Sequence, residues 1–180
     1  MNEGLIPGRY AKALYKYASE RGESQTVYGQ MKTLAESYAS APALKKAVEN
    51  PFLRLEDKEK VLLAASGSKK DGCVAQFVKL VIGQNRESFL RDIALAYQKI
   101  YRQVNGIAQV EIVTASKLGG DKVKKIVEVV KGQLAGKKVE QTESVDPSLI
   151  GGFVVRVDSL LLDASIKNEL KKLRLKLLSN

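Results

Sequence analysis

The sequence contains no histidine and only one cysteine among its 180 residues. Without histidine it cannot form Ser–His or Cys–His nucleophilic pairs or imidazole zinc sites, and it lacks the commonest general base at neutral pH. One cysteine is too few for an internal disulfide or a thiolate metal site. Cys73 lies in an apolar helical stretch, where a free thiol usually packs as a small hydrophobic side chain. We therefore expect no catalytic, metal-binding or cofactor-binding residues, and an enzyme is the least favoured class of function.

Long apolar runs are also absent. The unbroken runs span only a few residues, such as 160–162, whereas a membrane span needs about 20. The first residues, MNEGLIPGRYAKALYKYASERG, lack the apolar core of a secretory signal. We expect no direct membrane insertion and no export. The 44% of hydrophobic residues is enough for a core in one large or two small domains.

Apolar residues at spacings of three and four predict helices over nearly all of residues 6–104. Proline and glycine divide this region: Pro42 and Pro51 disfavour helix in the residue before each, and Gly67 suits a left-handed helix end. The predicted helices cover about residues 6–21, 24–41, 42–49, 55–66, 71–83 and 86–105. With short connections and no strand pattern between them, they describe a six-helix bundle.

The periodicity changes at Asn105-Gly106. IAQVEIVTA, residues 107–115, is partly alternating and rich in β-branched residues, which predicts a strand. A helix over 121–134, a polar strand over 137–145 and a third strand in GGFVVRVDSLLLD, with room for a fourth, follow it. The last helix carries the apolar stripe Ile166, Leu170, Leu173 and Leu177, with its basic residues mostly on the other side. The predicted fold class is α+β: the N-terminal six-helix bundle, residues 1–105, is followed by a small C-terminal α/β domain, residues 106–180.

The net charge of +10 favours an acidic partner. Nucleic acid is one such partner, because lysine and arginine attract phosphates at long range. Most aromatic residues, however, fall on core-facing helical stripes, and no RNA-recognition, KH or helix-turn-helix pattern is present. A basic nucleic-acid-binding adaptor remains the alternative function at this point.

Two glycine pairs could suggest a phosphate site. Gly151-Gly152 precedes a strand rather than a helix, and no Lys-Ser/Thr follows, so it does not match a P-loop. Gly119-Gly120 precedes a helix, but Asp121 would repel an anion from that helix end. The favoured interpretation of Gly151-Gly152 is a tight entry into a strand, where glycine permits positive φ or a close backbone approach.

The stretch DPSLIGGFVVRVDSLLLDASIKNELKKL, residues 146–173, resembles the C-terminal signature of the δ subunit of F-type ATP synthase, the family that includes the mitochondrial oligomycin-sensitivity-conferring protein. RYAKALYKYA, NPFLRLEDKEKVLLAA and RESFLRDIALAYQKIYRQVNGIAQVEIVTA resemble its other motifs in the same order. Pro7-Gly8 and Gly119-Gly120-Asp121 depart from the family pattern. The residues that fill the signature are Ile150, Gly151, Gly152, Arg156, Asp163, Ser165 and Leu170.

The resemblance implies a non-catalytic peripheral-stalk (stator) subunit, one copy per complex, on the cytoplasmic face of the bacterial membrane. In the family the helical domain binds the N-terminal segment of an α subunit in a groove between the first and fifth helices, and the C-terminal domain binds the b subunit. No nucleic acid takes part. The groove candidates in this sequence are Tyr10, Ala13, Leu14, Tyr17, Phe77, Val78 and Val81. The candidates for the side facing b are Lys167, Lys171, Lys172 and Arg174.

Overall fold

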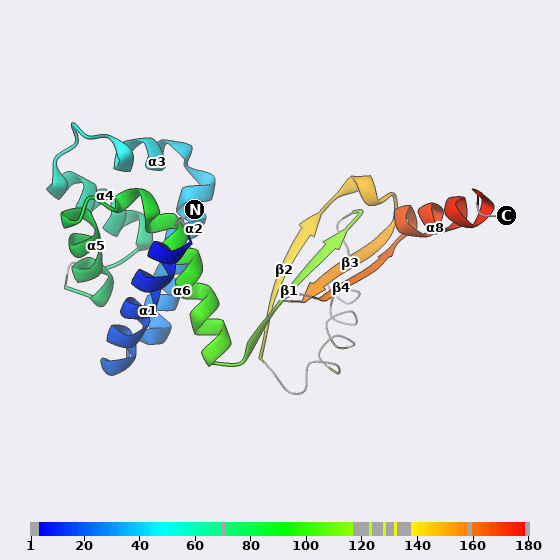
Figure 1. The fold of residues 1–180 in the computed structure, drawn as a ribbon, viewed down its shortest axis with the longest axis horizontal. Coiled ribbons are helices and arrows are strands. Elements are labelled where there is room, and N and C mark those ends of the chain that lie inside the picture. The colour runs from blue at the N-terminus through cyan, green and yellow to red at the C-terminus, as the bar shows by residue number, and fades with distance from the viewer. Residues whose placement is uncertain are drawn as a thin grey trace. The chain divides into compact units, whose positions relative to one another are not determined.

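The computed structural model describes residues 4–69, 71–116, 123, 128, 132, 138–157 and 160–178. The chain divides into two compact units, Met1–Tyr101 and Arg102–Asn180, a division that falls a few residues before the boundary at 105/106 predicted from the sequence. The first unit is helical, and the second contains a sheet (Figure 1). Each is described by itself below. No helix in the described part of the chain is long and apolar enough to cross a membrane.

The helical unit confirms the predicted bundle. Its elements are α1 (Leu5–Glu20), α2 (Ser24–Ser40), α3 (Pro42–Glu49), α4 (Leu55–Ser66), α5 (Cys73–Gly83), the 3₁₀ helix η1 (Glu87–Phe89) and α6 (Leu90–Val104). The predicted sixth helix therefore begins as a 3₁₀ turn. Gly67 ends α4 with φ +64°, the left-handed conformation that glycine adopts without a steric penalty. Pro7 lies in the first turn of α1, where a missing backbone N–H costs no hydrogen bond.

One apolar face of each long helix forms the bundle core. Leu14, Met31, Leu34, Leu62 and Leu90 are at most 1% exposed. Burial of large aliphatic side chains contributes about 1.5–3 kcal/mol each, so these contacts dominate the stability of the unit. Cys73 is also buried, which confirms its expected role as a small hydrophobic residue.

Polar contacts inside the bundle fix the position of α6 and η1. The Tyr97 hydroxyl donates to the Ser24 carbonyl at 3.1 Å. Lys58, on α4, is 4% exposed and pairs with Glu87, on η1, at 2.5 Å. A buried cation without a partner would be costly, so this pair constrains how α4 and η1 pack.

The second unit is built on a four-stranded sheet with the order β2-β1-β3-β4. β1 (Ile107–Thr114) lies parallel to β2 (Lys138–Val145) and antiparallel to β3 (Gly152–Val157), which in turn pairs antiparallel with β4 (Leu160–Ser165). The short helix η2 (Pro147–Leu149) precedes β3, and α8 (Ile166–Leu178) follows β4. Most of the helix predicted over 121–134 lies outside the described residues; Val123, Glu128 and Gly132 within it are helical.

The alternation predicted for the first strand is confirmed. Ala108, Val110 and Ile112 are completely buried and form the sheet core with Val155 and Val157. The side chains between them on β1 point to the other, more exposed face, as the two-residue period of a strand requires. The sheet therefore has one well-packed face.

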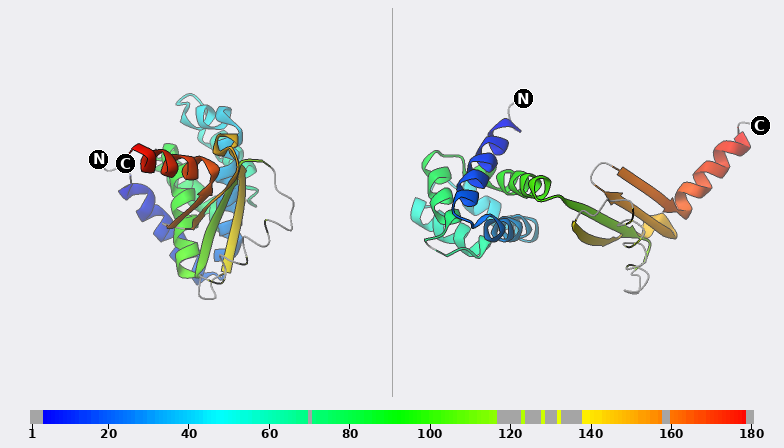
Figure 2. Two further views of the ribbon diagram at one scale, coloured as in Figure 1. Left: turned by 90° about the vertical axis from the view of Figure 1, so that its right-hand side faces the viewer. Right: turned by 90° about the horizontal axis from the view of Figure 1, so that it is seen from below.

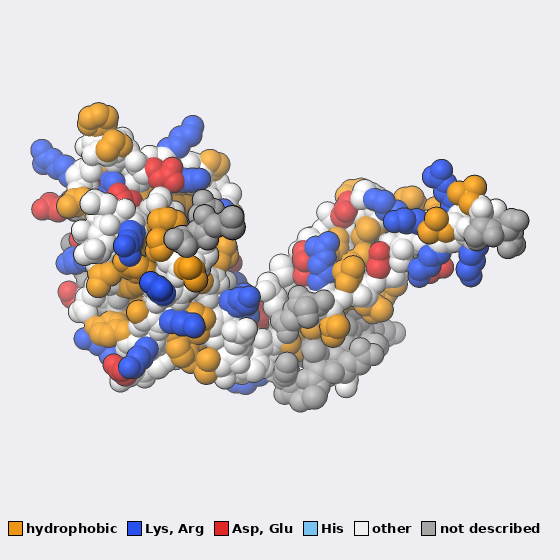
Figure 3. All heavy atoms as spheres, in the orientation of Figure 1, with side chains coloured by type: hydrophobic (Ala, Val, Ile, Leu, Met, Phe, Trp, Pro, Cys, Tyr) orange, Lys and Arg blue, Asp and Glu red, His pale blue; other side chains and the backbone are white. Residues whose placement is uncertain are grey.

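The apolar stripe of the C-terminal helix stays exposed, although such a stripe usually packs against a partner. α8 has no buried residue and projects beyond the sheet from the end of β4 (Figures 1 and 2). Leu170, Leu173 and Leu177 are 52%, 55% and 80% exposed. The neighbouring edge strand β4 also exposes three consecutive leucines, Leu160–Leu162, at 71%, 63% and 55%. β4 and α8 thus both expose apolar side chains, and basic side chains are interleaved with them along the helix (Figure 3).

Candidate functional site

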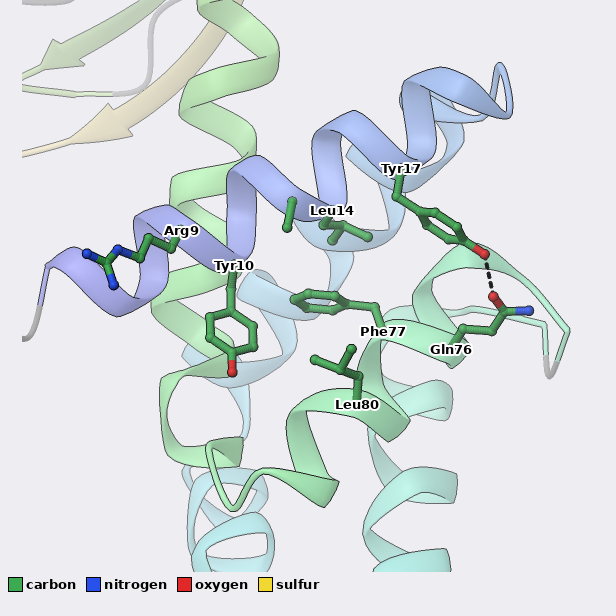
Figure 4. Close-up of a pocket in the computed structure, with 8 residues that line it drawn as sticks. Arg9, Tyr10, Leu14, Tyr17, Gln76, Phe77 and Leu80 are labelled. Atoms are coloured by element: carbon green, nitrogen blue, oxygen red, sulfur yellow. Dashed lines mark hydrogen bonds between the residues drawn. The ribbon is translucent and has the colours of Figure 1, made fainter.

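The helical unit has an open pocket of about 590 Å³ between α1 and α5. Its lining is mainly apolar and aromatic, and Figure 4 shows the side chains of the two helices facing each other across it. A mainly apolar concave site with a few polar groups is the usual form of a binding site. The lining residues are Arg9, Tyr10, Ala13, Leu14, Tyr17, Gln76, Phe77 and Leu80.

Helical periodicity explains why these residues meet. On α1, Tyr10, Ala13, Leu14 and Tyr17 follow one another at spacings of three, one and three, so they share one face. Leu14 is 1% exposed and forms the floor of the pocket, whereas Ala13 is exposed at its rim. Leu80 of α5 is 54% exposed. The pocket is therefore a groove whose apolar walls remain accessible to a partner.

Aromatic contacts hold the two ends of the groove. At one end Tyr10 meets Phe77 edge to face, with ring centroids 6.2 Å apart, and its hydroxyl accepts a hydrogen bond from Arg86 Nη1 at 2.8 Å. At the other end the Tyr17 hydroxyl donates to Gln76 Oε1 (Figure 4), and the Arg21 guanidinium lies 4.5 Å from the Tyr17 ring centroid. These contacts connect α1 to α5 and its following turn, so they preorganise the groove.

The structure brings five of the seven groove candidates together around this pocket: Tyr10, Ala13, Leu14, Tyr17 and Phe77. Val78 and Val81 do not line it. Both are completely buried, because they lie on the face of α5 that packs into the bundle. They support the groove wall from behind.

Sequence reasoning missed Arg9, Gln76 and Leu80 as lining residues. Leu80 follows Phe77 by three positions, and this i, i+3 spacing was a usable signal. Gln76 and Arg9 are polar, and no apolar stripe identifies them. Their role appears only when α1 and α5 are placed side by side.

The second candidate surface lies on α8. Lys167, Lys171, Lys172 and Arg174 are all exposed there. Two of them have nearby polar partners: Lys167 Nζ lies 3.4 Å from Ser148 Oγ, and Lys172 Nζ lies 3.6 Å from a Glu169 carboxylate oxygen. Exposed pairs of this kind contribute little to stability, so the cations remain available to a partner.

The glycine pair of the C-terminal signature makes a close approach between β3 and β4. Gly152 has φ +76°, and a Cβ there would lie 2.2 Å from the Ala164 carbonyl oxygen. A Cβ on Gly151 would lie 2.4 Å from Ile166 Cδ1. The glycines therefore serve the strand entry that the sequence favours.

The other signature residues connect β4 to α8. Asp163 accepts a hydrogen bond from the Ser165 backbone N–H at 2.9 Å. Hydrogen bonding from the Ser165 side chain, followed by this backbone bond, lowers the pKa of the Asp163 carboxyl group. Ser165 Oγ accepts from the Asn168 N–H at 3.2 Å, which caps the start of α8.

Two further signature residues lie elsewhere in the unit. Arg156 of β3 pairs with Glu111 of β1 at 3.1 Å. Leu170 lies on the exposed stripe described above.

Within the described residues, no group of three or more His, Cys, Asp or Glu side chains could hold a metal ion. Burial raises the pKa of the Cys73 thiol, which keeps it protonated and unreactive at neutral pH. The groove lining contains no carboxylate or thiol. Its geometry suits the binding of an apolar chain segment.

Residues 6–177 match the family described as ATP synthase delta (OSCP) subunit. The chain belongs to this family. An ATP synthase subunit delta from Phocaeicola vulgatus is 37% identical over 172 residues, which cover 95% of this chain and 92% of the relative. Another, from Parabacteroides distasonis, is 36% identical over 180 residues, covering 100% of this chain and 99% of the relative. The alternative of a nucleic-acid-binding adaptor finds no support in these similarities.

The fold is also found in a solved assembly. A chain in the cryo-EM structure of the Toxoplasma gondii mitochondrial ATP synthase hexamer superposes with a TM-score of 0.76 at 22% identity, over 96% of this chain and 97% of that chain. At this identity the similarity concerns the fold alone. It confirms the α+β class predicted from the sequence.

Proposed function

We propose that this chain is a stator connector of an F-type ATP synthase, with its helical unit on the catalytic head and its sheet unit on the membrane-anchored b subunits. Membership of the delta (OSCP) family supports a place in the peripheral stalk of that enzyme. The connector carries out no reaction itself. One copy per complex, peripheral on the cytoplasmic face of the bacterial membrane, holds the head still while the rotor turns.

The groove between α1 and α5 is the observation that carries this proposal. Its partner is the N-terminal segment of an α subunit, bound as an amphipathic helix. Such a helix inserts apolar side chains at i, i+3, i+4 and i+7 into a hydrophobic groove. Leu80 and the rim residue Ala13 are accessible from outside, and Leu14 and Phe77 provide an apolar floor.

The surface of β4 and α8 is the site proposed for the b subunit. It combines the exposed leucines of β4, residues 160–162, with the apolar stripe of α8. Exposed apolar side chains bordered by polar ones are typical of a protein interface. Lys167, Lys171, Lys172 and Arg174 supply that border and contribute electrostatic attraction to b. Assembly with b that does not depend on salt would argue against this contribution.

The head-binding role is tested by titrating the N-terminal segment of the α subunit from the same genome into the full chain by calorimetry. Ala13→Asp should weaken binding at least tenfold, because the partner helix would press its apolar face against a carboxylate and remove water from it. Ala43→Asp, an exposed alanine on α3 away from the groove, is the matched control and should bind as the wild type does. Equal affinities for the two variants would place the binding site elsewhere.

A second measurement tests the complex as a whole. Detergent-solubilised membranes from cells with a tagged copy of this chain should yield the α, β and b subunits with it. Recovery of the chain without these subunits would contradict the connector role.

A further inference from the structure

A row of cations follows the α1 rim of the groove. Arg9 lines the pocket, and Lys12 and Lys16 continue from it at spacings of three and four. At 100° per residue, Arg9 and Lys16 lie within about 60° of the rim residue Ala13 around the helix axis, and Lys12 lies about 100° from it, farther from the groove. All three cations are exposed, and none forms an ion pair with another described residue. As far as the described residues go, the row can therefore meet charges on a bound segment.

The opposite wall offers no compensating negative charge. α5 contains no acidic residue, and its one cation, Lys79, pairs with Glu59 of α4 at 3.5 Å. On α1 the only carboxylate is Glu20, at the C-terminal end of the helix. The two walls of the groove thus carry four basic residues and one acidic residue.

Both ends of the groove are also flanked by guanidinium groups. Arg86 is held against Tyr10 by the hydrogen bond at 2.8 Å, and Arg21 lies over the Tyr17 ring at 4.5 Å. Stacking on the ring limits where each guanidinium can go without neutralising it. A segment lying in the groove therefore meets positive charge along one side and at each end.

We propose that the groove selects an acidic amphipathic helix: one whose apolar stripe enters between α1 and α5 and whose carboxylates, spaced three to four residues apart, lie toward Arg9 and Lys16, with Lys12 adding attraction at longer range. This assignment rests on the proposed role of the groove as the head-binding site and adds the charge pattern of the segment that it accepts. The apolar contacts supply most of the affinity. The cation row supplies orientation, faster association and discrimination against basic helices, because complementary charges act mainly on these properties.

The proposal is tested with two synthetic helical peptides titrated into the full chain. The peptides share the same stripe of leucine and isoleucine at i, i+3, i+4 and i+7, and they differ only in three flanking residues, which are glutamate in one and glutamine in the other. At about 20 mM salt the glutamate peptide should bind about tenfold more tightly, as expected for three exposed ion pairs. The difference should largely disappear at about 0.5 M salt, where such pairs are screened.

A triple variant identifies the cations responsible. Replacing Arg9, Lys12 and Lys16 by glutamine should bring the ratio of the two peptide affinities close to one and slow the association of the glutamate peptide. The control replaces three exposed lysines of the same unit that do not line the groove, Lys45, Lys46 and Lys99; it changes the net charge equally and should keep the preference.

Equal binding of the two peptides at low salt, or the same loss of preference in the control, would overturn the charge assignment. The genomic α-subunit segment separates this result from the proposed function. If that segment binds through Ala13 but the synthetic peptides show no charge preference, only the charge pattern is wrong. If the peptides show the preference and the genomic segment does not bind, the groove takes a different acidic helix.

Discussion

Replacing Gly152 by alanine should destabilise the sheet unit while leaving the helical unit intact. Gly152 opens β3 opposite Ser165 of β4, and its φ of +76° lies in the region that side chains with a Cβ rarely adopt. The added methyl group would also lie 2.2 Å from the Ala164 carbonyl oxygen. That oxygen belongs to the backbone of β4, so it cannot move aside without shifting the strand.

The magnitude follows from these two costs. A left-handed conformation costs a residue with a Cβ about 1–2 kcal/mol. Forcing one extra carbon into a packed position typically costs about 1–3 kcal/mol. The lower entropy of the unfolded alanine chain returns less than about 1 kcal/mol. We expect Gly152→Ala to lower the free energy of unfolding of the sheet unit by about 3 kcal/mol.

Two signals report separately on the two units. All seven tyrosines lie between residues 10 and 101, so tyrosine fluorescence in urea follows the helical unit. Hydrogen exchange of the β3 and β4 amides follows the sheet unit. Gly152→Ala should speed the exchange of those amides about a hundredfold and leave the fluorescence midpoint unchanged.

Two matched substitutions complete the experiment. Gly151→Ala should cost less, because the atom its Cβ would meet is the end of the flexible Ile166 side chain. Gly29→Ala lies inside α2 with no atom within 4 Å of the added Cβ and should stabilise the helical unit by about 1 kcal/mol. If Gly152→Ala exchanges no faster than Gly151→Ala, the close approach between β3 and β4 is not the reason for this glycine.

Two further substitutions test other parts of the molecule. Glu87→Gln should lower the free energy of unfolding of the helical unit by about 3 kcal/mol, because Lys58 would keep a buried charge without its counter-ion. Burial alone would raise the pKa of Glu87, but the hydrogen bond from Lys58, a backbone hydrogen bond and the charge of Lys58 together outweigh it and hold the pKa below its ordinary value. This stabilisation is therefore present above the unfolded pKa of about 4.3 and is lost as the pH falls through the folded pKa. The urea midpoints of the variant and the wild type should therefore converge in acid. A difference in midpoint that does not change with pH would contradict this. Leu173→Gln should weaken binding to the soluble part of b about tenfold with no loss of stability, since Leu173 is 55% exposed; a fall in the urea midpoint would show instead that this leucine packs within the unit.

Much of the fold could be predicted because its local signals agree with one another. Pro42 begins α3, Gly67 ends α4 in the left-handed conformation, and the alternation in residues 107–114 matches the buried and exposed faces of β1. In each case the residue type restricts the backbone or marks a face, independently of what packs against it. Local sequence therefore predicted the elements and most of their ends.

The groove could be predicted only in part. The α1 stripe identified Tyr10, Ala13, Leu14 and Tyr17 correctly as one face, but periodicity cannot distinguish a floor from a rim. On α5 almost every position is apolar, so the sequence did not separate buried Val78 from exposed Leu80. That distinction depends on the rotation of α5 against its neighbours, which is decided by tertiary packing.

The apolar stripe of α8 could not be interpreted fully either. An apolar stripe at helical spacing predicts a packing partner for that face of the helix. The sequence alone does not say whether the partner belongs to the same chain. In the structure Leu170 and Leu177 stay exposed. Sequence therefore predicted the amphipathic helix and left its contact unspecified.

The exposed leucines at 160–162 determine how the subunit behaves before it is assembled. They lie on β4, which is an edge strand of the sheet among the described residues, and such edges readily pair with further strands. A newly made copy that meets no partner is thus the form most prone to self-association. If a partner covers this edge during assembly, the solubility of the subunit depends on its incorporation. Surplus copies would then be lost from solution, and the supply of partner subunits would limit the amount of this subunit that accumulates.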